Sequence, residues 1–233
     1  MKYGGTPELS IVIPTVDVLS DRVRECVDAV RSNSEAEHEI VLVENRSPPQ
    51  GYTAPVNAGI RAAQGRYVVV LNDDVQMMEG WWPPLRKALD EGALVSFADF
   101  GGFPKSDFFA APCIALSREA LTECAHSPES FLDPRFKVWF QDLDLLLRLC
   151  EMKRPPVPVA SRFQGKWATT VKSLDDPEMS AWVREQIAAD QLAFSEKWSG
   201  GKRGARAKAI LAPFMEPDEP AAVTTQGEAE LGG

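Results

Sequence analysis

The first third of the chain contains three short apolar runs, at residues 9–14, 39–44 and 67–71. Within each run the apolar residues are mostly consecutive, which is typical of strands buried on both faces, as in a parallel sheet. The first run ends at Pro14, which cannot donate to a continuing ladder, and the third leads directly into Asn72, Asp73 and Asp74. The pattern therefore predicts buried strands with polar residues at their carboxyl ends.

Helical periodicity separates these runs. Apolar residues 19, 23, 26, 27 and 30 share one helical face, and residues 56, 60 and 63 mark a shorter helix that Gly65 closes. Strand, helix, strand, helix, strand with short connections predicts an α/β fold with a mostly parallel, doubly wound sheet. The residues after the first strand, 14–17, contain no glycine-rich turn, which counts against a dehydrogenase.

The remaining pattern continues the alternation less regularly. A helix that starts near residue 142 is apolar nearly all round, so we expect it to be buried. The last segment, 201–233, is basic and then acidic and rich in Pro, Ala and Gly, which predicts disorder. We assign one domain to residues 1–200. Its other predicted elements are helices over 81–91, 117–124 and 179–198, strands over 93–98 and 109–116, and a loop over 99–108.

Composition narrows the class of protein. The chain has 233 residues with a formal net charge of −9, which argues against nucleic-acid binding through the whole surface. Four widely spaced cysteines without a CxxC pair predict reduced thiols. We see neither a secretory signal nor a run long enough to span a membrane, so we expect a cytoplasmic protein with at most peripheral membrane contact.

Candidate chemistry lies at two places. In open α/β sheets ligands bind at the carboxyl ends of the strands, where Asn72, Asp73 and Asp74 are expected, and their oxygens suit a divalent cation that carries phosphates. A polar turn is the alternative reading of these three residues. The second place is the start of the buried helix, where Asp142 and Asp144 project to roughly opposite sides. We expect one of them to face a cleft and the other to pair with Arg148.

Over roughly residues 8–200 the chain resembles the family 2 glycosyltransferases, and most of all their bacterial rhamnosyltransferase-like branch. No single motif carries this resemblance; their order and spacing do. The motifs are SIVIPT at 10–15, VENRS at 43–47, NAG at 57–59, LNDDV at 71–75, FLDPRF at 131–136 and QDLDL at 141–145.

The resemblance implies a GT-A fold and an inverting transfer of a sugar from a nucleotide diphosphate to an acceptor hydroxyl. It implies a nucleotide-binding half at about 8–98 and an acceptor half at about 99–200. Asp142 would be the catalytic base, and Asp74 would ligate Mn²⁺ or Mg²⁺. A UDP- or dTDP-sugar donor is favoured, whereas the acceptor (glycan, lipid-linked or protein) is open. The implied donor-binding residues are Pro14, Thr15, Glu44, Asn45, Asn57, Asn72 and Asp73.

Two departures from the family pattern affect this reading. Gln141 precedes the expected base where the family usually has an acid, and no histidine follows it, since the only histidines are His38 and His126. Lys166 would compensate as a positive charge on the donor phosphates. Two alternatives therefore stay open: a glycosyltransferase-like binding module without turnover, and a sugar-phosphate nucleotidyltransferase.

Overall fold

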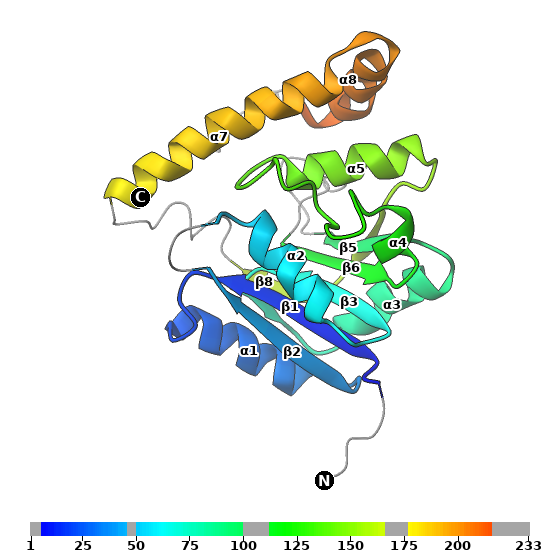
Figure 1. Ribbon diagram of the computed structural model, residues 1–233. Helices are drawn as coiled ribbons and strands as arrows, with labels where there is room; N and C mark the ends of the chain where they lie inside the picture. The colour runs from blue at the N-terminus through cyan, green and yellow to red at the C-terminus, as the bar shows by residue number, and fades with distance from the viewer. Residues whose placement is uncertain (1–5, 46–49, 100–111, 166–176, 216–233) are drawn as a thin grey trace, which may run out of the picture.

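The computed structural model describes residues 6–45, 50–99, 112–165 and 177–215, with a six-stranded central sheet and a two-stranded ribbon (Figure 1). The central sheet has the order β2-β1-β3-β6-β5-β7 and the ribbon pairs β4 with β8. The strands are β1 (Leu9–Thr15), β2 (His38–Glu44), β3 (Tyr67–Leu71), β4 (Val75–Met77), β5 (Val95–Asp99), β6 (Cys113–Ser117), β7 (Val157–Ala160) and β8 (Phe163–Gly165). The helices are α1 (Asp21–Asn33), α2 (Thr53–Ala62), α3 (Trp82–Asp90), α4 (Ala120–Glu123), α5 (Gln141–Glu151), α7 (Pro177–Trp198) and α8 (Gly201–Met215).

The central sheet is mixed but mostly parallel. β1 pairs in parallel with β2 on one side and β3 on the other, and β5 pairs in parallel with β7. Only β6 runs against its neighbours, pairing antiparallel with both β3 and β5. The predicted α/β class and the mostly parallel sheet are confirmed.

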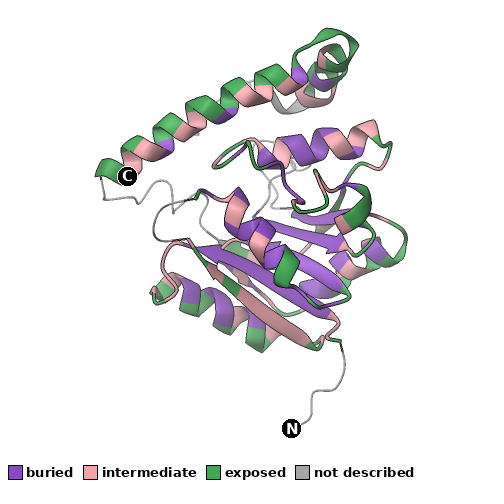
Figure 2. Ribbon diagram, in the orientation of Figure 1, coloured by how far each residue is buried: buried purple, intermediate pink, exposed green. Residues whose placement is uncertain are grey.

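Helices cover both faces of the sheet because the buried strands are apolar on both faces. Leu9, Ile11 and Ile13 of β1 pack with α1 and α3 in one core, whereas Val12 packs with α2 and α5 in the other. β1 and β3 are buried along their whole length, and β2 at the edge is only partly buried (Figure 2). A third apolar cluster joins Leu147 of α5 to the two C-terminal helices, which lie on the side of α5 away from the sheet (Figure 1).

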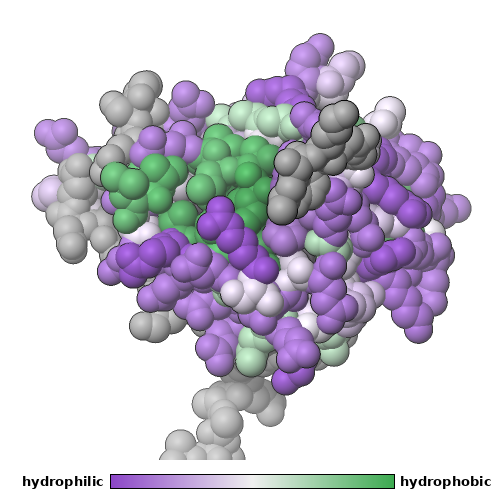
Figure 3. Space-filling view, turned by 90° about the horizontal axis from the view of Figure 1, so that it is seen from below, coloured by the Kyte–Doolittle hydropathy of each residue, from purple (hydrophilic) through white to green (hydrophobic). Residues whose placement is uncertain are grey.

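The surface is mainly hydrophilic. Seen from below, hydrophilic side chains cover most of the molecule and hydrophobic ones gather in one patch (Figure 3). Among the large hydrophobic residues, Leu42 on the edge strand β2 is 40% exposed. Within the described ranges no helix has the length and apolar character needed to cross a membrane. The four cysteines are free thiols, as predicted.

Several predicted boundaries were wrong. Leu19 is 85% exposed, because α1 begins only after Ser20, whose Oγ accepts a hydrogen bond from the N–H of Val23. α2 ends before Ala63 rather than at Gly65. Gly65 is needed for a different reason, since a Cβ there would lie 2.5 Å from the backbone nitrogen of Ser10.

The C-terminal half holds the larger differences. β7 and β8 occupy a segment to which the sequence assigns no element. The prediction of disorder from residue 201 onwards is wrong for α8, which is helical, while residues 216–233 lie outside the described residues. The predicted loop 99–108 lies almost wholly outside them too. The division into a nucleotide-binding and an acceptor half stays a prediction.

Candidate active site

The candidate site lies where the strand order of the central sheet changes direction. β2 lies on one side of β1 and β3 on the other, so the carboxyl ends of β1 and β3 form a topological switch point. Ligands of open α/β sheets bind at such a point. Thr15 ends β1, and Asn72 to Asp74 follow β3, so these four residues meet there.

Asp73 is the buried anchor of this edge, with 4% of its surface exposed. Its Oδ2 accepts hydrogen bonds from Thr15 Oγ1 at 2.6 Å and from Arg22 Nη2, on the first turn of α1, at 3.1 Å. Burial raises the pKa of Asp73, the bonds from Thr15 and Arg22 oppose that rise, and the charge of Asp74 adds to it. Sequence reasoning found Thr15 and Asp73 but missed Arg22.

Two buried polar atoms beside Asp73 have no protein partner within the described part of the chain. They are Asn72 Oδ1, an acceptor, and Arg22 Nε, a donor. Buried polar groups in proteins are nearly always hydrogen-bonded, so unpaired ones point to a ligand or water. Asp74 is partly exposed, as a residue that contacts a ligand needs to be. The switch point therefore offers both donors and acceptors to a polar ligand.

The predicted nucleoside-binding residues lie nearby. Pro14 is buried in β1, and Glu44 is exposed at the end of β2. The backbone N–H of Asn45 donates to the carbonyl of Thr15 at 2.8 Å, which ties the ends of the two strands together. The side chain of Asn45 bonds to the backbone of residues 50 and 51, at 2.9 Å and 2.5 Å. Asn45 thus joins the end of β2 to the start of the next described segment.

Asn57 makes a different contact from the predicted one. Its Nδ2 donates to the carbonyl of Leu132 at 3.0 Å, and its Oδ1 accepts from the N–H of Leu132 at 2.9 Å. The amide is 4% exposed and joins α2 to the segment that leads into α5. This contact favours a structural role, and donor binding by Asn57 stays a prediction.

Asp142 lies in the first turn of α5, after Phe140 in a left-handed conformation with φ of 70°. Its Oδ1 accepts from the N–H of Leu143 at 2.8 Å. Burial raises the pKa of Asp142 to about 6, more than these backbone groups lower it. Gln141 beside it is 8% exposed, and its Oε1 has no partner among the described residues.

Tyr52, at the start of α2, connects the two carboxylate sites. Its phenol has a raised pKa, caused first by burial and then by the negative charges of Asp142, Asp74 and, more weakly, Asp73. Because the charges of all three carboxylates act on this one phenol, the end of β3 and the start of α5 are near each other. Sequence reasoning missed Tyr52, because nothing in its local pattern distinguishes it from a core aromatic.

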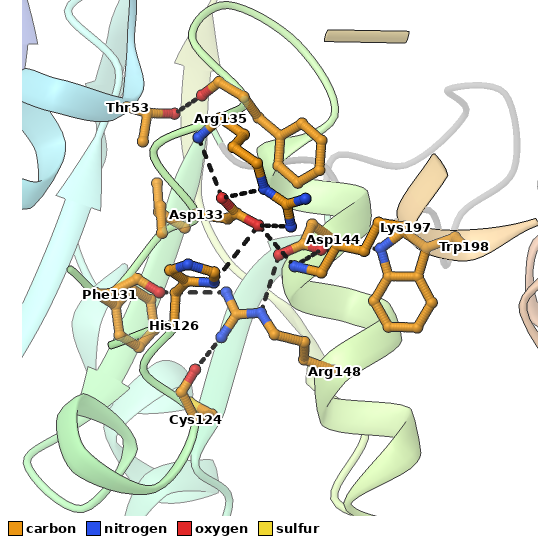
Figure 4. A network of polar contacts seen from close by, with 12 residues as sticks. Thr53, Cys124, His126, Phe131, Asp133, Arg135, Asp144, Arg148, Lys197 and Trp198 are labelled. Carbon is orange, nitrogen blue, oxygen red and sulfur yellow. Dashed lines mark hydrogen bonds and ion pairs between the residues drawn. The ribbon is translucent and has the colours of Figure 1, made fainter. Parts of the chain in front are cut away.

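Asp144 faces away from this site, as expected from its spacing to Asp142. It is fully buried and pairs with Arg148 at 2.9 Å and with Lys197 at 2.6 Å. Figure 4 shows these contacts within a larger network that includes Asp133 and His126. In this network Nδ1 of His126 lies 3.4 Å from Asp133 Oδ2.

The ribbon β4–β8 brings a distant segment to the switch point. Val75, next to Asp74, pairs with Gly165, the residue before Lys166 in the sequence. Lys166 itself lies outside the described residues, so its phosphate contact stays a prediction.

Comparison with known proteins is consistent with this geometry. The sequence profile of the family described as "Glycosyl transferase family 2" matches residues 47–131, and no curated protein matches the chain. Glucosyl-3-phosphoglycerate synthase from Mycobacterium tuberculosis, solved with Mn²⁺, UDP and glucosyl-3-phosphoglycerate, superposes with a TM-score of 0.55 at 14% identity, over 78% of each chain.

S. aureus TarS 1–349 in complex with UDP superposes with a TM-score of 0.56 at 15% identity, over 89% of this chain and 70% of that one. Neither structure is described as a rhamnosyltransferase, so the expected branch gains no support. At such low identity the superpositions show a shared GT-A-like fold. The profile match over residues 47–131 and the GT-A-like fold are thus two separate similarities to family 2 glycosyltransferases.

Proposed function

We propose that the protein is a metal-dependent, inverting glycosyltransferase that moves a sugar from a uridine diphosphate donor to an acceptor hydroxyl. The observation that carries the proposal is that the negative charges of Asp142, Asp74 and Asp73 all act on the phenol of Tyr52. One pocket would then hold a donor at Asp73 and Asp74 and an acceptor at Asp142. The UDP found in two structures of similar fold supports this choice of nucleotide.

Donor binding is assigned to the switch point. Thr15 and Arg22 fix the carboxylate of Asp73, which we assign to the ribose hydroxyls of the donor. The unpaired Nε of Arg22 and the predicted Lys166 would offer positive charge to the diphosphate. Pro14, Glu44 and Asn45 would line the nucleoside side of the pocket.

The residues present fit a divalent metal that is shared with the donor. Within the described ranges no cluster of three or more His, Cys, Asp and Glu side chains could hold a metal alone. Mg²⁺ commonly takes only one or two carboxylates from the protein and completes its shell with substrate phosphates and water. Asp74, with the unpaired Oδ1 of Asn72 nearby, supplies such oxygens. When bound, Mn²⁺ or Mg²⁺ would neutralise negative charge on the departing nucleotide diphosphate.

Acceptor activation is assigned to Asp142. A general base works best when its pKa lies near the working pH. With a pKa of about 6, Asp142 is ionised at neutral pH and is still basic enough to accept a proton. It would take the proton of the acceptor hydroxyl as that oxygen attacks the anomeric carbon, in line with the departing diphosphate. Inversion follows from this single displacement.

The donor half of the proposal is tested by calorimetric titration with UDP in the presence and absence of Mn²⁺. Wild type should bind UDP more tightly with Mn²⁺, and Asp74→Ala should lose most of that gain, with an affinity at least tenfold weaker. Asp28→Ala, which removes an exposed acid from α1, is the matched control and should bind as wild type does. Equal Mn²⁺-dependent affinity in Asp74→Ala would contradict the metal role.

The alternative of a binding module without turnover rests on Gln141, an amide where an acid is usual. The unpaired Oε1 of this residue is suited to accept a hydrogen bond from a sugar hydroxyl, which needs no acid. Release of UDP from a UDP-sugar in the presence of Mn²⁺ separates the two functions, because a binding module releases none.

A further inference from the structure

The segment 136–140 leads directly into α5, whose second residue is Asp142. It is irregular, so its backbone groups need partners outside helices and strands. α2 supplies some of them: the hydroxyl of Thr53 donates to the carbonyl of Phe136, and the N–H of Tyr52 donates to the carbonyl of Lys137 at 2.5 Å. The start of α2 thus holds one side of the segment.

Asp190, in the middle of α7, holds the other side. Its Oδ1 accepts from the N–H of Lys137 at 3.0 Å, and its Oδ2 accepts from the N–H groups of Val138 at 2.7 Å and Trp139 at 2.9 Å. Asp190 is 1% exposed. Successive N–H groups that converge on one carboxylate form charge-assisted bonds, which are about twice as strong as neutral ones.

Other residues on the same face of α7 contact the same region. Phe194 lies four residues after Asp190, and its ring centroid is 5.0 Å from that of Phe140 and 6.1 Å from that of Phe136. Lys197, seven residues after Asp190, contacts Asp133 at 2.8 Å and Asp144 at 2.6 Å (Figure 4). Residues four and seven apart share one face of a helix, so a single face of α7 docks on the segment and on α5.

We propose that Asp190 is a positioning residue for the acceptor base: by binding the backbone of residues 137–139, it fixes the start of α5 and with it the carboxylate of Asp142. This inference rests on the proposed function. Asp190 acts through the backbone and not on substrate. Because the donor-binding residues Thr15, Asp73 and Asp74 belong to other elements, its loss should slow turnover and leave donor affinity unchanged.

The test replaces Asp190 by Asn. The amide keeps the shape but has one acceptor oxygen, so its NH₂ group faces at least one backbone N–H. With UDP-glucose and Mn²⁺, Asp190→Asn should lower kcat for UDP release at least tenfold, with KM for the donor and Kd for UDP within twofold of wild type. Glu185→Gln, which removes an exposed charge on the same helix, should match wild type. Unchanged kcat, or loss of UDP affinity in proportion to kcat, would overturn the proposal.

Hydrogen exchange supplies the readout that does not depend on turnover. In wild type the amides of Lys137, Val138 and Trp139 should exchange as slowly as those within α5, although they lie in an irregular segment. In Asp190→Asn these three should exchange faster while the amides of β1 do not change. Fast exchange of the three amides in wild type would overturn the proposal even if the variant fails to fold. A wild type that neither binds UDP nor releases it would instead refute the proposed function, and the base-positioning role with it.

Discussion

At the residue scale, the site depends on how each carboxylate is partnered. Asp73 is buried and fixed by Thr15 and Arg22, whereas among the described residues Asp142 accepts from the backbone N–H of Leu143 and has a pKa of about 6. This difference fits the two proposed roles. A carboxylate that binds the donor benefits from partners that fix its position, whereas a general base needs a pKa near the working pH. Sequence patterns located both carboxylates, since each begins or ends a buried apolar run. They could not locate Arg22, whose contact with Asp73 joins residues 51 positions apart.

The hydroxyl of Thr15 is the first residue-scale prediction. Thr15→Val keeps the shape of the side chain and removes the 2.6 Å bond to Asp73, which will raise the pKa of Asp73 further. At pH 7.5 the unfolding free energy should fall by about 1–3 kcal/mol, as expected for a lost bond to a buried charge. The loss should be smaller at pH 4, because a carboxyl with a raised pKa loses its charge at a higher pH than an ordinary one as the pH falls.

Chemical denaturation at the two pH values measures this effect. Thr15→Ser restores the donor and should recover most of the stability. If Thr15→Val is as stable as wild type at pH 7.5, the bond does not hold Asp73 in place.

At the element scale, the sequence located elements whose apolar pattern is local. β1 and β3 are continuous apolar runs, and both were predicted. β7 was not predicted, because prolines argue against strands. Pro158 is tolerated there because β7 is the last strand at one edge of the sheet. α8 was missed because its sequence resembles a solvated basic tail. Ala207 on α8 is buried in the same cluster as Leu147 of α5, a contact that no local pattern reveals.

The junction of α7 with α5 carries the element-scale prediction. Lys197 is 10% exposed and bridges the fully buried Asp133 and Asp144. Burial raises the pKa of Asp133, but the hydrogen bonds from Arg135 and Lys197 outweigh it, so the net pKa is lowered. Lys197→Met keeps most of the packing and removes the charge. It should lower the unfolding free energy at pH 7 by about 3–5 kcal/mol, the cost of breaking a buried ion pair.

The pH dependence of that loss gives the control. A carboxylate with a lowered pKa stabilises the fold above its unfolded pKa and loses this effect as pH falls, so the difference between Lys197→Met and wild type should narrow below about pH 4. Glu196→Gln, an exposed change next in sequence, should be neutral. A difference that stays constant with pH would show that packing, and not charge, holds the two helices together.

At the scale of the whole molecule, the central sheet and the helices on its faces bring the end of β1, the residues after β3 and the start of α5 near one another. The order and spacing of the motifs predicted the fold class, because the motifs lie at the strand ends, and the family 2 profile matches the chain over residues 47–131. The contribution of α7 was beyond sequence reasoning, because Asp190 contacts a segment about 50 residues earlier through backbone atoms, which leave no trace in residue types. The proposed site thus depends on the C-terminal helix α7 as well as on the strand ends.

The most direct test of the central claim compares wild type with Asp142→Asn in UDP release from UDP-sugars and in UDP binding, both with Mn²⁺. Wild type should release UDP at a rate that rises with pH around an apparent pKa of about 6, because the base must be ionised. Asp142→Asn should lower that rate at least a hundredfold, within the range typical of a lost general base, and bind UDP within twofold of wild type. Wild-type turnover in Asp142→Asn, or loss of UDP binding together with turnover, would contradict a site that holds the donor at Asp73 and Asp74 and activates the acceptor at Asp142.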